Sequence, residues 1–310
     1  MPNDRICLTI GDPTGIGPEI TAKFLSRNLV SNLIVIGDIA GLRETADWLE
    51  VTLPENGVDY INVAAAGKLP GRAAYDAIEK AVALIAEEKA SQLVTGPVSK
   101  ENLLAAGIEY PGHTEILEEL ANRFWPTQNW QADMLFVHST FRMLLLTRHI
   151  PLSQVSYALS SEGVCRSLDN LTAYLNAEGI EKPKLAVMGM NPHGGEIGGT
   201  EEQLVLEPVI EKINASKKAD CFGPMAADAL FRGFDPNNIL YDAYVACYHD
   251  QGLIPFKMIA GYEAVNVTIG LPFVRTSVSH GTAPDIVGKG VADPRSLQAA
   301  FGLLKTVVTV

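Results

Sequence analysis

Cysteine is scarce in this chain, and its four residues are widely scattered. Cys7, Cys165, Cys221 and Cys247 form no C-x-x-C pair, and Cys7 and Cys247 lie inside apolar runs of the kind that form strands. This distribution is typical of buried, reduced thiols in a cytosolic protein rather than of a disulfide framework.

Long apolar runs and an excess of basic residues are also missing. No apolar stretch reaches the length of a membrane span, and the segment MPNDRICLTIGDP lacks the basic and apolar regions of a signal peptide. Lys and Arg total 24 against 36 Asp and Glu, which gives a formal net charge of −12. Such a chain is not expected to bind nucleic acid or a membrane surface, although a local cluster of cations could bind a small anion. We therefore expect a cytoplasmic protein.

The chain does contain enough apolar sequence for a large core. Of its 310 residues, 47% are hydrophobic and 19% are charged, which favours a folded protein over a disordered one. The length suits one large α/β domain or two domains of ordinary size. Neither an internal repeat nor a linker marks a domain boundary in the sequence.

Short apolar runs alternate with amphipathic helical stretches along the chain. This alternation is typical of an α/β protein with mostly parallel strands. Two runs, 133–138 and 141–147, are close enough to pair as a hairpin. The other predicted strands are 6–10, 33–37, 92–95, 184–190, 243–247 and 265–271, and the predicted helices start near Pro18, follow an N-cap at Asp38, and cover 73–89 and 295–309.

Four of the six histidines, His138, His149, His193 and His249, lie at or just past the C-terminal end of a predicted strand. In open α/β sheets the ligand site lies outside those ends, and neutral imidazoles gathered there can bind a borderline metal such as zinc. The spacing of His149, His193 and His249 matches no compact zinc pattern, so these residues could equally be structural hydrogen-bonding groups. The strand-end pattern alone does not distinguish His138 from the other three.

Two glycine-containing turns also follow predicted strands. GDPTGIGPE (11–19) precedes a helix, and TGPVSK (95–100) ends in a lysine at a helix start. Glycine lets a backbone approach a ligand, and a helix N-terminus favours anions. Neither segment is a G-x-G-x-x-G fingerprint or a P-loop, so each is interpreted either as an anion site or as a tight strand-to-helix turn.

Two further segments place polar groups among apolar neighbours. YHDQGLIPFK (248–257) combines an imidazole, a carboxylate, an amide and a lysine. VNVTIGLPFVRTSVSHGT (265–282) adds Asn266, Arg275 and His280. Polar residues in such surroundings are costly unless they are paired or functional. Lys257 and Arg275 are therefore candidate clamps for a phosphate or a carboxylate.

Taken together, these motifs resemble those of the 4-hydroxythreonine-4-phosphate dehydrogenase family. HGTAPDIVGKGVADP (280–294) is also similar to the adenosine-binding loop of isocitrate and isopropylmalate dehydrogenases, and the resemblance implies their fold, with two α/β domains and a cleft between them. It implies a first domain of residues 1–128 plus 265–310, and a second of residues 129–264 that carries the dimer interface. The motifs, which extend from residue 11 to residue 283, are GDPTGIGPE, TGPVSK, PGHTE, GMNPHGGE with GTEE, YHDQGLIPFK and VNVTIGLPFVRTSVSHGTA.

The resemblance implies a metal-dependent, NAD-linked dehydrogenase of pyridoxine 5'-phosphate biosynthesis. The family oxidises and decarboxylates 4-phosphohydroxy-L-threonine to 3-amino-2-oxopropyl phosphate. A sister group acts on D-erythronate or D-threonate 4-phosphate, and the motifs do not cleanly separate the two groups. A phosphate acyltransferase is an alternative of another class with a related fold, but it needs neither a metal nor a nicotinamide.

The same resemblance assigns roles to individual residues and implies a homodimer whose sites are shared across the interface. His249 of one chain is expected to complete a metal site held by His149 and His193 of the other. Lys257 and Asp250 are both candidates for proton transfer, because they lie beside the metal-ligand motif. The implied ligands of a divalent metal (zinc, or cobalt, manganese or magnesium) are His149, His193 and His249; the implied substrate contacts are His113, Thr114, Lys257, Asn266 and Arg275; the implied NAD contacts are His280, Gly281, Thr282, Ala283 and Asp285.

Three positions depart from the resemblance. Ser99 stands where many relatives carry His or Asn, and Ser279 stands where many carry Asp. Asp293 occupies a position that is usually Asn in the isopropylmalate enzymes. These departures bear on the contacts with substrate and cofactor rather than on the fold.

Overall fold

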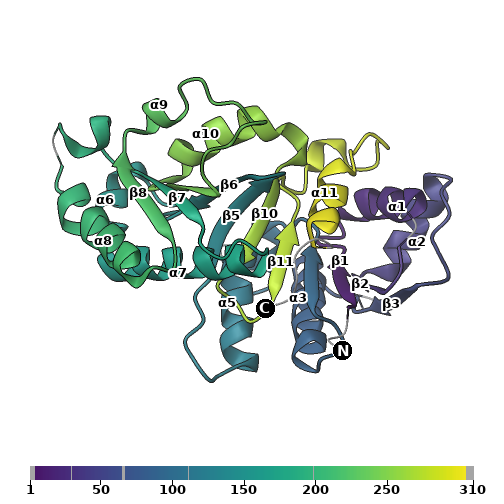
Figure 1. Ribbon diagram of the computed structural model, residues 1–310. Coiled ribbons are helices and arrows are strands. Elements are labelled where there is room, and N and C mark those ends of the chain that lie inside the picture. The colour runs from purple at the N-terminus through teal and green to yellow at the C-terminus, as the bar shows by residue number, and fades with distance from the viewer. Residues whose placement is uncertain (1–3, 29, 65–66, 111, 198, 305–310) are drawn as a thin grey trace. The chain divides into compact units, whose positions relative to one another are not determined.

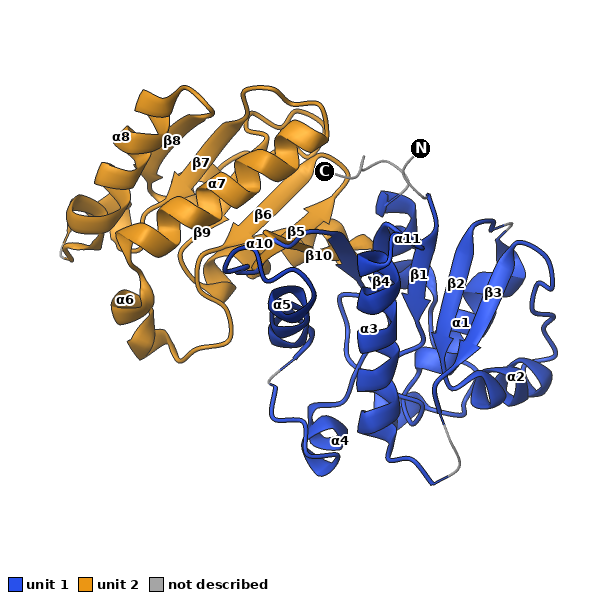
Figure 2. Cartoon of the chain, turned by 90° about the horizontal axis from the view of Figure 1, so that it is seen from below, with its two compact units in different colours: residues 1–132, 271–309 blue, residues 133–270, 310 orange. Residues whose placement is uncertain are grey.

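The chain folds into two compact units, which Figure 2 shows in different colours. Unit 1 comprises residues 1–132 and 271–309, so it combines an N-terminal and a C-terminal segment of the chain, and unit 2 comprises residues 133–270 and residue 310. None of the described helices is both long and apolar enough to cross a membrane. The structure is a computed structural model that describes residues 4–28, 30–64, 67–110, 112–197 and 199–304 (Figure 1).

Unit 1 is built on parallel strands in the order β3-β2-β1-β4-β11. The last of these, β11, comes from the C-terminal part of the chain and pairs with β4, with Thr276 opposite Val94. The elements of unit 1 are β1 (Ile6–Thr9), α1 (Gly17–Arg27), β2 (Leu33–Gly37), α2 (Ile39–Trp48), β3 (Val58–Asn62), α3 (Pro70–Ala86), β4 (Gln92–Thr95), α4 (Lys100–Ala105), α5 (His113–Phe124), β11 (Val274–Ser277), η5 (Pro284–Ile286) and α11 (Arg295–Leu304).

Side-chain alternation divides the core of unit 1 between the two faces of its sheet. Cys7, Ile34 and Leu93 belong to one apolar cluster with the buried faces of α3 and α5. Successive side chains of a strand point to opposite faces, so Leu8 and Val94, which are both fully buried, face the other side. Strands buried on both faces are typical of parallel sheets covered by helices.

Unit 2 mixes the two kinds of strand pairing in the order β10-β5-β6-β9-β7-β8. β10, β5 and β6 are antiparallel neighbours, whereas β6, β9, β7 and β8 pair in parallel. The elements of unit 2 are β5 (Asp133–His138), β6 (Phe141–Leu145), η1 (Leu152–Gln154), α6 (Val155–Ala158), α7 (Ser161–Ala177), β7 (Lys184–Met188), η2 (Pro192–Gly195), η3 (Glu202–Leu206), α8 (Glu207–Ser216), β8 (Asp220–Met225), α9 (Ala227–Leu230), β9 (Ala243–Ala246), α10 (His249–Ala260), η4 (Gly261–Glu263) and β10 (Val265–Ile269).

Helix α10 packs on the central strands of unit 2. Its buried Leu253 and Phe256 join a cluster with Phe136 of β5 and Phe141 of β6. The rings of Phe141 and Phe256 stack with their centroids 5.1 Å apart. This packing fixes the start of α10 over the ends of the strands, and His249 is the first residue of that helix.

The predicted α/β class and the mostly parallel pairing are confirmed. β2, β4 and β5 have the predicted bounds, and β5 and β6 form the predicted antiparallel hairpin. Asp38 caps α2 by accepting a hydrogen bond from Gly41 N. The helix predicted over 295–309 is present as α11 over its described part, Arg295–Leu304, and residues 305–309 lie outside the described residues.

Candidate active site

Three of the predicted ligands follow neighbouring strands of unit 2. His149, His249 and His193 come after β6, β9 and β7, which lie side by side and run in the same direction. Their C-terminal ends therefore share one edge of the sheet. His138 ends β5, which is antiparallel to β6, so it lies at the opposite edge, where its Nδ1 is 3.9 Å from Glu263. Strand direction thus separates His138 from the other three.

His149 and His249 of the same chain line one pocket. Their ring centroids are 5.7 Å apart, and the pocket is also lined by Leu152 and Tyr248. Asp250 lies beside them, with Oδ1 2.8 Å from His249 Nδ1. When Nδ1 carries the proton and donates a hydrogen bond to the carboxylate, Nε2 of His249 keeps the lone pair that a metal ligand needs.

His193 is held in a tight turn after β7. Its φ of 58° is in the left-handed region, which is uncommon for a residue with a side chain and often marks a functional site. The turn is braced by Glu202, whose carboxylate accepts from Asn191 N at 2.7 Å and from Asn191 Nδ2 at 2.9 Å. Within the described part of this single chain, no three His, Cys, Asp or Glu side chains form a group that could hold a metal ion.

The glycine-rich turn of unit 1 is packed tightly rather than open. A Cβ added at Gly11, where φ is +88°, would lie 2.3 Å from Pro97 O, and one at Gly15 would lie 2.7 Å from Thr282 Cβ. Asp12 accepts from both the backbone N and the hydroxyl of Thr14, at 2.9 and 2.7 Å. The glycines therefore let the turns after β1 and β4 and the loop after β11 approach one another, which favours the tight-turn interpretation.

Arg275 and His113 form a polar pair inside unit 1. Arg275 is 1% exposed, and its Nε donates to Thr95 Oγ1 at 2.9 Å. Burial lowers the pKa of Arg275 to about 9, which leaves its guanidinium charged at neutral pH. Desolvation and the nearby Arg275 charge hold the pKa of His113 well below its usual value. A hydrogen bond with the Gly96 backbone acts in the opposite direction but has the smaller effect on this pKa. His113 is therefore neutral at physiological pH, and its buried Nε2 has no hydrogen-bond partner among the described residues.

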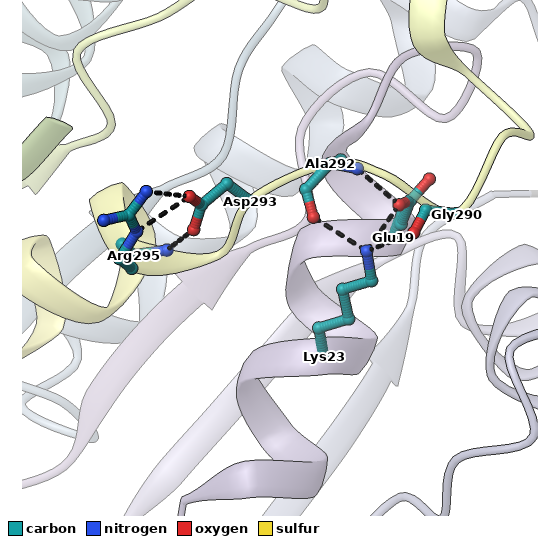
Figure 3. Close-up of polar contacts among 6 residues, drawn as sticks. All are labelled: Glu19, Lys23, Gly290, Ala292, Asp293 and Arg295. Atoms are coloured by element: carbon teal, nitrogen blue, oxygen red, sulfur yellow. Dashed lines mark hydrogen bonds and ion pairs between the residues drawn. The ribbon is translucent and has the colours of Figure 1, made fainter.

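Two anchors hold the loop that follows β11, one at the N-cap residue of α1 and one within that helix. Near the start of the loop, Ile16 N donates to Thr282 O at 3.0 Å. Near its end, Lys23 Nζ donates to Gly290 O at 2.9 Å and to Ala292 O at 2.8 Å, and it pairs with Glu19 Oε1 at 2.7 Å (Figure 3). The same Glu19 oxygen accepts from Ala292 N at 2.7 Å. Of the predicted NAD-binding residues, Thr282 is thus itself anchored, and Ala283 and Asp285 lie between the two anchors.

Within that loop, Ala283 has a left-handed φ of 44°, and Asp285 is exposed. His280 Nδ1 contacts Gly281 O at 2.9 Å, while its buried Nε2 has no partner in the described ranges. Asp293, further along, forms a pair with Arg295 at 2.5 Å. Arg295 lowers the pKa of the Asp293 carboxyl by hydrogen bonding.

The remaining predicted residues are divided between the units. Thr114 is buried in the first turn of α5 in unit 1. In unit 2, Asn266 lies on β10 opposite Phe136, and Lys257 is exposed in the last turn of α10. Ser99 caps α4 by accepting from Asn102 N, which gives this departure a local structural role.

Sequence reasoning did not single out Glu19, Lys23 or Glu202, and it named Gln251 only as an amide in a polar motif. An acid and a base four residues apart on a helix that follows a buried strand could have suggested the Glu19–Lys23 pair. Nothing in the sequence indicates that its partners are the carbonyls of residues 290 and 292, because that contact depends on the placement of β11.

Comparison with known proteins gives the same family over nearly the whole chain. A model of the family described as "Pyridoxal phosphate biosynthetic protein PdxA" matches residues 25–304. A protein of Beijerinckia indica subsp. indica named 4-hydroxythreonine-4-phosphate dehydrogenase is 39% identical, over 97% of this chain and 94% of that protein. A protein of Cupriavidus necator named D-threonate 4-phosphate dehydrogenase is 36% identical, over 96% and 95%.

The backbone of the chain also resembles that of a solved structure. The crystal structure of 4-hydroxythreonine-4-phosphate dehydrogenase from Klebsiella pneumoniae superimposes with a TM-score of 0.82 at 31% sequence identity. The superposition covers 97% of this chain and 98% of that one.

Proposed function

The chain belongs to the family of the pyridoxal phosphate biosynthetic protein PdxA, and on that premise we propose that it is a 4-hydroxythreonine-4-phosphate dehydrogenase. The proposed reaction is the NAD-linked oxidation of 4-phosphohydroxy-L-threonine, followed by decarboxylation to 3-amino-2-oxopropyl phosphate. The observation that carries the proposal is the placement of His149, His193 and His249 at one edge of three neighbouring strands, in a chain 39% identical to a protein of that name. We also propose a cytoplasmic location, in keeping with four free cysteines.

A second candidate is a D-threonate 4-phosphate dehydrogenase. It is favoured by the relative of that name, which is 36% identical over almost the full length of both proteins. Both substrates carry a phosphate, a carboxylate and an oxidisable hydroxyl, so the same anion-binding side chains serve either one. The two functions differ in the group next to the carboxylate, which is an amine in one substrate and a hydroxyl in the other.

The residues present fit a divalent metal. The imidazoles of His149 and His249 lie 5.7 Å apart between ring centroids, and the Asp250 carboxylate orients one of them. A bound ion would supply a Lewis acid that lowers the pKa of the substrate hydroxyl, and a nicotinamide would supply the hydride acceptor. His149 and His193 of one chain, with His249 of a second copy, would hold the ion through neutral nitrogen ligands.

The chain's own residues would bind the substrate and move its protons. Arg275, which is charged and fixed by Thr95, suits a phosphate or carboxylate group. Neutral His113 can donate or accept a hydrogen bond without repelling that cation. Because Asp250 is already bonded to His249, Lys257 is the better candidate for taking the hydroxyl proton and returning one after the loss of CO2.

The loop after β11 fits a dinucleotide in two respects. Asp285 is exposed on it, and the buried Nε2 of His280 has no partner among the described residues. A carboxylate at this place can accept from a ribose 2′-hydroxyl and would repel a 2′-phosphate. We therefore propose NAD rather than NADP as the cofactor.

The function is tested by measuring NADH formation with purified protein and three substrates. We expect kcat/KM to be highest for 4-phosphohydroxy-L-threonine, and lower for D-erythronate and D-threonate 4-phosphates. Exhaustive chelation should abolish turnover, and zinc, cobalt, manganese or magnesium should restore it. A higher kcat/KM for D-threonate 4-phosphate would replace the proposed substrate by the second candidate. Full activity in protein shown by elemental analysis to be metal-free would refute the metal site.

The cofactor choice predicts the effect of Asp285→Asn. The ratio of kcat/KM for NAD to that for NADP should narrow by about tenfold or more, because a hydrogen bond to a charged acceptor contributes roughly 1.5–3 kcal/mol and about 1.4 kcal/mol corresponds to tenfold. Asp293→Asn is the matched control, since that carboxylate lies on the same loop but is occupied by Arg295. It should leave the ratio unchanged. A wild-type preference for NADP, or the same ratio in Asp285→Asn as in the wild type, would contradict the assignment.

A homodimer with shared sites is also proposed. Exposed apolar side chains line the pocket of His149 and His249, where Leu152 is 69% exposed and Ile150 is 36% exposed. Apolar side chains gathered in this way often mark a protein–protein interface. A second copy seated there would cover them and bring its own histidines to the same region.

A further inference from the structure

The side chain of Glu201 connects the segments that carry two of the candidate metal ligands. Glu201 is the N-cap residue of η3, and its Oε1 accepts a hydrogen bond from the hydroxyl of Ser156 in α6. Its Oε2 accepts from Asn191 Nδ2 at 3.0 Å, and Asn191 lies two residues before His193. Ser156 lies seven residues after His149. One carboxylate therefore joins the His149 segment to the His193 segment within a single chain.

The segment that carries His149 is held on both sides of that residue. On the N-terminal side, Thr147 Oγ1 donates to Cys247 O at 2.6 Å, and Thr147 N donates to the same oxygen at 3.2 Å. On the C-terminal side, the hydroxyl of Ser156 donates to Glu201. The first contact fixes the segment to the residue that follows β9. The second contact fixes it to the part of the chain that follows β7.

The turn that carries His193 is held by two neighbouring carboxylates. Asn191 N donates to Glu202 Oε1 at 2.7 Å, and Asn191 Nδ2 donates to Glu202 Oε2 at 2.9 Å as well as to Glu201. These bonds of Glu202, which is 1% exposed, stabilise the turn itself. Glu201 also reaches Ser156 in a different part of the chain, so it relates the turn to the His149 segment.

Only part of this arrangement is explained by local structure. Thr200 N donates to Glu201 Oε2 at 2.9 Å, which holds the carboxylate next to its own backbone. The bond from Ser156 has no such local purpose, because the two residues are 45 positions apart. It is also the main cause that lowers the pKa of Glu201 to about 2. The carboxylate is therefore ionised at neutral pH and can accept from both segments at once.

We propose that Glu201 is a positioning residue for the histidine site, and that its bond to Ser156 sets the separation of His149 and His193. In the proposed shared site these two ligands come from one chain, and His249 comes from a second copy. Their separation is therefore fixed within the chain. The inference rests on the proposed function and adds to it a residue that contacts neither metal nor substrate. Groups that orient metal ligands in this way typically contribute about 10–100-fold to metal affinity.

The test is a cobalt(II) titration of the purified protein, followed by its visible d–d absorption. Ser156→Ala removes the bond to Glu201 and leaves every charge in place, so weaker binding by this variant reports on geometry rather than on electrostatics. Ser156→Thr keeps a hydroxyl at the same position and is the conservative variant. Ser153→Ala is the matched control, because it removes a hydroxyl from an exposed residue of the preceding η1.

A second variant tests the carboxylate itself. Glu201→Gln presents one acceptor oxygen where the carboxylate uses two, so it cannot hold both segments in the same way. It also removes a negative charge, which by itself weakens the binding of a cation. Glu207→Gln is its control, because it removes a carboxylate from an exposed residue at the start of α8.

We expect Ser156→Ala and Glu201→Gln to bind cobalt about 10–100-fold more weakly than the wild type, with altered d–d bands. Ser156→Thr and the two controls should stay close to the wild type in affinity and spectrum. Far-UV circular dichroism should be unchanged in all five variants.

The outcomes separate this inference from the proposed function. If the wild type binds cobalt and Ser156→Ala matches it in affinity and spectrum, the positioning role is wrong and the proposed function stands. An equal loss of affinity in Ser153→Ala would also overturn the role of the Ser156 bond. If the wild type itself binds no cobalt, the metal site and this inference fall together.

Discussion

Replacing Lys23 by methionine is expected to lower the free energy of unfolding of unit 1 by about 3–5 kcal/mol. The side chains of Lys23 and Glu19 are 10% and 4% exposed, so the substitution leaves a buried carboxylate without its countercharge. It also removes the donor to the carbonyls of Gly290 and Ala292. Urea unfolding followed by tryptophan fluorescence measures this unit alone, because Trp48, Trp125 and Trp130 all belong to it.

A surface pair of the same length provides the control. Lys89 and Glu87 are also 2.7 Å apart, but their side chains are 63% and 50% exposed. Lys89→Met should therefore change the free energy of unfolding by about 0–1 kcal/mol. Adding Glu19→Gln to Lys23→Met should recover part of the loss, since the uncompensated charge is then gone. A Lys23→Met variant within 1 kcal/mol of the wild type would show that the pair contributes no more than a surface contact.

The second large effect concerns the shared site. His149→Ala and His249→Ala should each be inactive alone, because each site then lacks a ligand. If His249 completes the site of the other chain, a mixed dimer has one site without either ligand and one intact site. Random exchange forms mixed dimers in about half of the population, so roughly a quarter of wild-type activity should return.

The measurement is NADH formation after the two variants have been mixed under conditions in which subunit exchange is demonstrated. A mixture of each variant with itself is the control and should stay inactive. The proximity of His149 and His249 within one chain, 5.7 Å between ring centroids, makes the experiment decisive. If one chain supplied both ligands, every site in the mixture would lack one, and the absence of recovery would reject sharing between chains.

The elements that the sequence predicted well are those buried on both faces. β2, with the sequence LIVIG, is apolar throughout and fully buried, and its predicted bounds match the structure. β3 was missed because it is half exposed and mixes polar with apolar residues, and β8 because its sequence, DCFGPM, contains a Gly-Pro pair. β11 was missed because Arg275 sits within it, and a buried arginine resembles a functional loop residue more than a strand residue.

The sequence predicted which residues belong to the candidate site, but it did not predict how they are arranged in space. The motifs identified His113, Arg275 and the strand-end histidines, yet they could not separate His138 from His149. That distinction needs the direction of β5 relative to β6. The bonds from Lys23 Nζ to Gly290 O and from Gln251 Nε2 to Gly189 O were likewise hidden, because these backbone carbonyls are brought near by segments far away in the sequence. Every residue has a backbone carbonyl, so residue type does not indicate which carbonyl a side chain will contact.

The discontinuous build of unit 1 has a consequence for the order in which the chain can fold during synthesis. β4 leaves the ribosome early, but its partner β11 lies almost two hundred residues downstream, beyond the whole of unit 2. At 5–20 residues per second, the wait is roughly 10–40 s. Unit 2 is continuous from 133 to 270 and can fold in the meantime, while the edge of β4 stays unpaired. An unpaired strand edge is a template for aggregation, so the nascent N-terminal part of this protein is the stage at which a chaperone would matter most.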